Sequence, residues 1–261
     1  MARIHPRSKL VSLLKEKLTR AKISKAAAME LEEYTQRAPT GSLLRQIILG
    51  GQDGLVNVLG IALGVASATT NAQLVLVAGL AGTFAESISM AAVAYTSARA
   101  MQDHYRSEVE REKWEMAHLP EVEREEVRLL YMKKGFRGNA LNNIVRKITS
   151  NKRTWLEVML SDELGLGAEM RKVNPAREAA VVGLASLAGS FIPLIPFAFA
   201  PVWPAMLASA ALSVAVLFLA GWQKARMTIG SPLRSGLEMA LVGGAAALAG
   251  YLIGSAVGQL V

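Results

Sequence analysis

Residues 54–85 read GLVNVLGIALGVASATTNAQLVLVAGLAGTFA, and none of these side chains is charged. Asp53 stands directly before this stretch, and Glu86 stands directly after it. A helix needs about 20 predominantly apolar residues to cross the hydrocarbon core of a bilayer. Extended to residue 98, the stretch has room for two crossings, so we expect membrane helices over about 47–68 and 73–98.

Two further charge-free stretches, residues 179–223 and 239–261, extend this pattern toward the C-terminus. The first predicts a helical hairpin over about 179–221, with four prolines between 193 and 204 at its turn. The second predicts a fifth helix over about 237–260. The expected fold class is therefore all-α: a polytopic membrane protein with five transmembrane helices.

A strongly charged segment, residues 101–175, separates the second and third expected membrane helices. It predicts a helical insert, with helices over about 102–117, 120–134 and 138–166, the last interrupted near Ser150 and Asn151. The expected organisation is a basic amphipathic segment (1–45), helices one and two (46–100), the insert (101–175) and helices three to five (176–261). The N-terminal segment either lies on an anionic membrane surface or is a solvated tail.

The distribution of basic residues predicts the topology. The formal net charge is +8, and the Lys and Arg residues cluster beside the expected membrane helices, as the positive-inside rule requires. This explains the charge without nucleic acid, which we do not expect as a partner. The N-terminus, the insert and the 222–235 connection should be cytosolic, and the C-terminus should be outside.

The sequence contains no cysteine, which excludes disulfides and thiolate metal sites. No cleavable signal peptide is visible. A prokaryotic cell membrane is the default location, and a vacuolar membrane is the expectation for a eukaryotic source.

Polar side chains inside the first two expected membrane helices predict an ion path. Asp53 and Asn57 are four residues apart and share a helix face, and Glu86 and Met90 repeat this spacing in the next helix. A charged side chain at the centre of a membrane helix costs on the order of 2.5–3.5 kcal/mol on insertion scales, and such residues commonly mark transport pathways.

Carboxylates and one thioether recur at helical spacing in the insert. Glu108, Glu112 and Glu115 lie on one expected helix face, and Glu123 and Glu126 lie on the next. Met159 and Glu163 share a face of the third. Carboxylates suit hard divalent cations and a thioether adds softer character, so these seven residues are candidate metal ligands. The alternative is a solvated face neutralised by neighbouring Arg and Lys side chains.

Glu115, Met116, Ala117 and His118 form an ExxH motif. Di-iron carboxylate bundles use two such motifs, and neither His5 nor His104 follows a Glu by three residues. We therefore expect no enzyme and no prosthetic group, although a membrane-bound di-iron oxidase and a non-transporting metal sensor remain alternatives.

Several short motifs resemble the vacuolar iron transporter family of yeast and plant iron and manganese transporters and their prokaryotic relatives. The matching stretches are Asp53-Gly54-Leu55-Val56-Asn57, Ser89-Met90-Ala91, the Glu-rich insert, WLEVMLSDELGL at 155–166 and IPLIPF at 192–197. The resemblance covers about residue 44 to the C-terminus.

The resemblance implies a homodimer of five-helix subunits in the lipid bilayer that moves Fe²⁺, or related divalent ions such as Mn²⁺, out of the cytosol by proton antiport. It implies that Asp53 and Met90 lie on the ion path. It also implies a cytosolic metal-binding domain, whose ligands match by position Glu112, Glu115, Glu123, Glu126, Met159 and Glu163.

One departure concerns the second membrane helix. The family commonly has Gly-Glu-Tyr shortly after its methionine, and this chain has Val93-Ala94-Tyr95. Glu86 lies two turns earlier on the same face and could supply the missing carboxylate from the other side of Met90.

Overall fold

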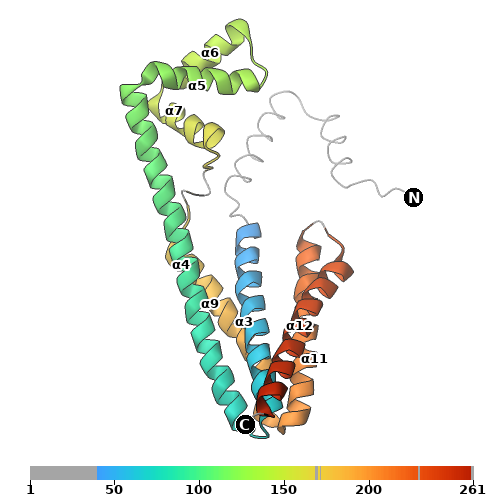
Figure 1. Ribbon diagram of the computed structural model, residues 1–261. Coiled ribbons are helices and arrows are strands. Elements are labelled where there is room, and N and C mark those ends of the chain that lie inside the picture. The colour runs from blue at the N-terminus through green and yellow to red at the C-terminus, as the bar shows by residue number, and fades with distance from the viewer. Residues whose placement is uncertain (1–39, 168–169, 171, 229, 260–261) are drawn as a thin grey trace, which may run out of the picture. The chain divides into compact units, whose positions relative to one another are not determined.

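The computed structural model describes residues 40–167, 170, 172–228 and 230–259, and every regular element in these ranges is a helix (Figure 1). The expected amphipathic segment lies outside the described residues apart from its last few positions. Those positions already belong to the first described helix, α3, which runs from Thr40 to Ala68.

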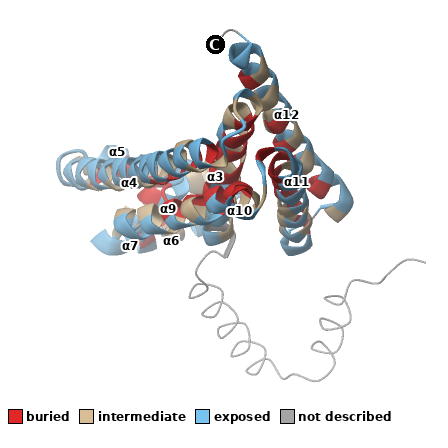
Figure 2. Cartoon of the chain, turned by 90° about the horizontal axis from the view of Figure 1, so that it is seen from below, coloured by how far each residue is buried: buried red, intermediate tan, exposed pale blue. Residues whose placement is uncertain are grey.

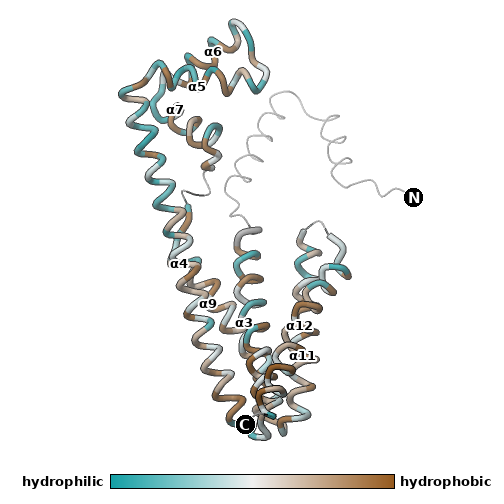
Figure 3. The backbone as a smooth tube through the Cα atoms, in the orientation of Figure 1, coloured by the Kyte–Doolittle hydropathy of each residue, from teal (hydrophilic) through white to brown (hydrophobic). Residues whose placement is uncertain are grey.

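Within the described residues, five helices are long and apolar enough to cross a membrane, as the sequence predicts. They are α3, α4 (Ala72–His118), α9 (Pro175–Phe191), α11 (Val202–Met227) and α12 (Pro232–Gly258). The third crossing continues through a 3₁₀ turn, η2 (Ile192–Leu194), into the short helix α10 (Ile195–Phe199). Figure 3 shows the apolar character of these helices beside the hydrophilic insert.

The second crossing differs from its prediction, because α4 is one continuous helix of 47 residues. The sequence suggests two helices, over 73–98 and 102–117, but no Gly or Pro follows Gly82 until Pro120, so nothing interrupts the backbone hydrogen bonds. At 1.5 Å per residue the helix is about 70 Å long, roughly twice the hydrocarbon thickness. The helix is therefore longer than one crossing needs, and the insert follows its C-terminal part.

Glycines allow the membrane helices to approach closely. An added methyl group at Gly50 or Gly54 of α3 would overlap backbone oxygens of Val182 or Ser186 in α9. One at Gly254 of α12 would overlap the Gly64 carbonyl of α3. These glycines therefore let helices of the same chain pack closely against one another.

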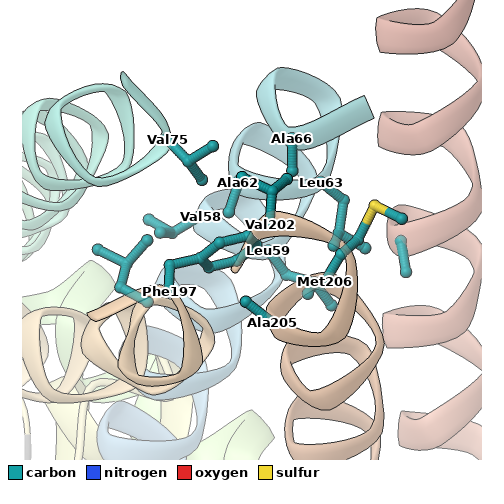
Figure 4. Packing of buried hydrophobic residues seen from close by; sticks show 12 residues of the cluster. Val58, Leu59, Ala62, Leu63, Ala66, Val75, Phe197, Val202, Ala205 and Met206 are labelled. Atoms are coloured by element: carbon teal, nitrogen blue, oxygen red, sulfur yellow. The ribbon is translucent and has the colours of Figure 1, made fainter. Parts of the chain in front are cut away.

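The main core lies where α3, α4, α10, α11 and α12 meet (Figures 2 and 4). Val58 and Leu59 of α3, Val75 of α4 and Ala205 of α11 are fully buried there, together with Phe197 of α10. This packing fixes α3 against its neighbours one to two turns beyond Asp53.

The insert has three helices and a core of its own. Helices α5 (Pro120–Lys133) and α6 (Gly138–Thr149) are followed by α7 (Lys152–Val158) and a π-helical turn, η1 (Met159–Glu163). The break predicted near Asn151 is present, because the Asn151 side chain caps α7 by accepting from the amides of Arg153 and Thr154. Val127, Leu141, Val145, Ile148, Trp155 and Met159 form the buried core.

Candidate metal-capture and translocation sites

The insert brings three of the predicted carboxylates together. Glu112 and Glu115 lie on the last turns of α4, and Glu123 lies on the first turn of α5. The chain reverses between them at Leu119 and Pro120, where Pro120 starts α5. One carboxylate oxygen from each of the three residues lies within 4.8 Å of the other two. This spacing suits ligands that converge on a single cation.

Burial distinguishes these carboxylates from an ordinary charged helix face. Glu112 is 1% exposed and Glu123 is 3% exposed. The buried Oε2 atoms of Glu112 and Glu123 accept no hydrogen bond, although a buried carboxylate without a partner is costly. The alternative of a solvated face therefore fails for these two residues, and their free oxygens are available to a cation.

The same burial changes how the carboxyls titrate. Burial, together with the negative charges of Glu126, Glu112 and Glu115, raises the pKa of Glu123 to about 8. Burial also raises the pKa of Glu112, where the hydrogen bond from Arg111 opposes the effect. At neutral pH the empty site therefore holds at least one proton that a divalent cation would displace.

Glu126 and Glu163 belong to the same electrostatic group. The pKa of Glu163 is raised first by burial and then by the charges of Glu126 and Glu112. Glu163 ends η1, which packs against both α4 and α5. Glu108 lies one turn before Glu112, and its carboxylate pairs with Arg111 rather than joining the group of three.

Met159 occupies the first position of η1 and is completely buried. It packs in the insert core with Val127 and Trp155, and Met116 of α4 contacts the same cluster. A π-helical turn widens the helix and is frequent at functional sites. The sequence predicts a helix here, but the i to i−5 bond from Leu164 to Met159 was not foreseeable from residue spacing.

Arg111, which residue spacing alone did not single out, lies against the candidate ligands. Its guanidinium pairs with three of the candidate ligands: Nη2 lies 2.9 Å from Glu108 Oε2 and 3.3 Å from Glu112 Oε1, and Nε lies 3.6 Å from Glu115 Oε2. Sequence reasoning treats Arg111 as a neutralising neighbour on an exposed face. The structure shows that it contacts the buried cluster.

The candidate membrane path is assembled from α3 and α4. The Glu86 carboxyl of α4 lies near the side chains of Asp53 and Asn57 of α3. Asp53, Glu86 and Met90 are partly exposed, and Asn57 is exposed, although all four lie in apolar helices. The structure thus brings together the two carboxyls and the amide, and it places Met90 one turn further along α4.

His118 does not join the carboxylates. Its ring stacks on Trp114 with the ring centroids 4.5 Å apart, and its Nδ1 lies 2.8 Å from the Trp114 carbonyl oxygen. These contacts hold the imidazole at the exposed end of α4. The ExxH motif is therefore a helix terminus in this structure.

Comparison with known proteins finds relatives that cover most of the chain. A family model described as "VIT family" matches residues 44–255. Vacuolar iron transporter 1 of Arabidopsis thaliana is 33% identical over 93% of this chain and 97% of its own length. Vacuolar iron transporter 2 of Oryza sativa subsp. japonica is 34% identical over 87% and 93%, and the vacuolar iron transporter of Plasmodium falciparum is 30% identical over 81% of each.

Proposed function

The chain belongs to the VIT family and is a multi-pass membrane metal transporter, and we propose that it exports Fe²⁺, and related ions such as Mn²⁺, from the cytosol in exchange for protons. The observation that carries the proposal is the convergence of the Glu112, Glu115 and Glu123 carboxylates, of which Glu112 and Glu123 are buried and each have one oxygen that accepts no hydrogen bond. The sequence motifs and the named relatives supply iron as the expected cargo.

Capture begins at the insert. A divalent cation bound between α4 and α5 neutralises carboxylates that repel one another while the site is empty. Glu126 and Glu163 add charge, and Met159 adds a thioether that favours Fe²⁺ over Mg²⁺ or Ca²⁺. Binding releases the proton held by Glu123, so capture is favoured at cytosolic pH over an acidic compartment.

Translocation uses the residues shared by α3 and α4. Asp53 of α3 and Glu86 of α4 are neighbouring carboxyls, and in the exchange that we propose this pair carries a proton when no cation is bound. An arriving cation displaces that proton, and a proton from the far side later displaces the cation. Glu86 thereby supplies the carboxylate that the family commonly has where this chain has Ala94. Met90 offers a further soft ligand.

Orientation and assembly follow from the charge pattern. The insert and the connection between α11 and α12 lie at the same end of the membrane helices (Figure 1). That connection is flanked by Lys224, Arg226 and Arg234, which favours the cytosol. A second copy of the chain would cover the exposed Asn57 face, because an uncovered amide in lipid is unfavourable.

Metal uptake into proteoliposomes tests the proposal. Wild-type protein should carry Fe²⁺ when a pH gradient is imposed, whereas Asp53→Asn and Met90→Leu should each lose most of the uptake. Glu238→Gln is the control, because this carboxylate pairs with Arg234 near the N-terminus of α12 and is not part of the proposed path. Normal uptake in both path variants would show that the path is wrongly assigned.

The same preparation separates the alternatives. A di-iron oxidase would consume oxygen as Fe²⁺ is added, and a sensor would bind metal without moving it. Export requires metal to cross the bilayer and requires no oxygen.

A further inference from the structure

One guanidinium, that of Arg111, pairs with several of the candidate metal ligands. Arg111 contacts Glu108, Glu112 and Glu115 at 2.9, 3.3 and 3.6 Å. No other Lys or Arg of the described chain forms an ion pair with Glu112 or Glu115. Arg111 is thus the one basic side chain of the described residues that pairs with these two candidate ligands.

The exposure of the Arg111 side chain allows its guanidinium to move away from the carboxylates. The Arg111 side chain is 49% exposed, whereas the Glu112 side chain that it contacts is 2% exposed. The guanidinium therefore joins buried carboxylates to solvent through a flexible stem. It remains charged at all physiological pH values, so deprotonation cannot remove it from the site.

A divalent ion and this guanidinium compete for the same oxygens. A bound metal ion lies about 2.0–2.6 Å from carboxylate oxygens, and two of the carboxylates that it needs, Glu112 and Glu115, already contact Arg111. A cation among those oxygens would lie within a few ångströms of the guanidinium, where like charges repel strongly in a partly buried site.

We propose that Arg111 is a tethered counter-cation that holds the empty carboxylate group together and must swing away when a divalent ion binds. The inference rests on the proposed capture function. It makes Arg111 a specificity-determining residue, because a cation that binds carboxylates weakly cannot displace the guanidinium. Binding should therefore favour ions that coordinate several carboxylates at once.

Calorimetric titration of the detergent-solubilised full-length protein with Mn²⁺ tests the inference. Arg111→Gln removes the competing guanidinium and should tighten Mn²⁺ binding roughly tenfold. This factor corresponds to the summed free energies of three partly exposed ion pairs. Arg111→Lys keeps the charge but not the fork that reaches several carboxylates, so its affinity should lie between wild type and Arg111→Gln.

Arg106→Gln is the matched control. It removes the same charge from the same helix, but Arg106 pairs only weakly with Asp103, at 3.9 Å. Its Mn²⁺ affinity should stay near the wild-type value. If Arg111→Gln and Arg106→Gln both bind Mn²⁺ more tightly by the same factor, the inference is overturned, because the long-range effect of losing one positive charge on α4 would then explain the result.

Two other results would also overturn the inference. Unchanged or weaker Mn²⁺ binding by Arg111→Gln, with wild-type binding intact, would overturn the inference and leave the capture function standing. A wild-type protein that binds no Mn²⁺, Fe²⁺ or Zn²⁺ would overturn the capture function and this inference with it.

Discussion

Glu123 combines deep burial, an oxygen without a hydrogen bond and a pKa of about 8. In the empty protein at neutral pH this carboxyl is mostly protonated, which limits the charge that the insert must bury. Binding of a metal requires the ionised form. Metal capture therefore releases a proton from a single residue, Glu123.

The pH dependence of binding follows from this coupling. Below about pH 8, Mn²⁺ must displace the Glu123 proton, so the apparent affinity should rise with pH by up to about tenfold per unit and level off above that value. Titrations between about pH 6 and pH 9 would measure the slope. Glu121→Gln, at a carboxylate that is 83% exposed, should leave the slope unchanged. A flat wild-type profile would contradict the assignment of Glu123 as a protonated ligand.

Substitution of Met159 tests whether its thioether coordinates metal or only packs in the insert core. Met159→Leu conserves volume, so it should cost less than about 1.5 kcal/mol of folding stability while removing the thioether. Affinity for Fe²⁺ should fall several-fold, and affinity for the harder Mn²⁺ should fall less. Thermal unfolding and paired titrations would measure both quantities. Equal affinities in wild type and variant would show that Met159 serves only the insert core.

At the scale of elements, charge-free runs predicted all five membrane helices because burial in lipid forbids most charges over a whole segment. The breaks at Pro120 and Asn151 were also predictable, since each has a local chemical cause. The continuity of α4 was not inferred, because a change from apolar to charged residues ends a membrane segment without ending a helix.

The candidate site was predictable in part. Helical spacing placed Glu112, Glu115 and Glu123 on facing surfaces, and the structure brings them within ligand distance. That Glu86 lies near Asp53 could not be read from the sequence, because single-helix periodicity does not fix how two helices are rotated. The π-helical turn at Met159 and the pairing of Arg111 depend on tertiary packing, which spacing does not encode.

The crossing of α3 and α12 gives a direct test of helix packing. A methyl group at Gly254 would overlap the Gly64 backbone, whereas one at Gly244 of the same helix meets nothing within 4 Å. Gly254→Ala should destabilise the protein by about 1–3 kcal/mol, and Gly244→Ala should be neutral or slightly stabilising. Thermal unfolding in detergent compares the two. Equal stability of the variants would mean that the helices do not cross so closely.

At the scale of the whole molecule, the absence of cysteine from the sequence makes the topology measurable. Single cysteines at Glu157 in the insert and at Gly230 between α11 and α12 should react with a membrane-impermeant maleimide only from the cytosolic side. A cysteine at Thr70, in the uncharged connection between α3 and α4, should react only from the other side. Labelling of positions 157 and 230 from opposite sides would contradict the proposed orientation.

Coupled transport is the central claim, and simultaneous recording of metal and proton flux in one population of proteoliposomes tests it most directly. Wild-type protein should move Fe²⁺ in one direction and protons in the other, with a fixed ratio as the metal concentration is varied. Glu86→Gln should weaken or abolish the proton flux, because it removes the carboxyl beside Asp53. Metal uptake by the wild type without any proton movement would contradict the account.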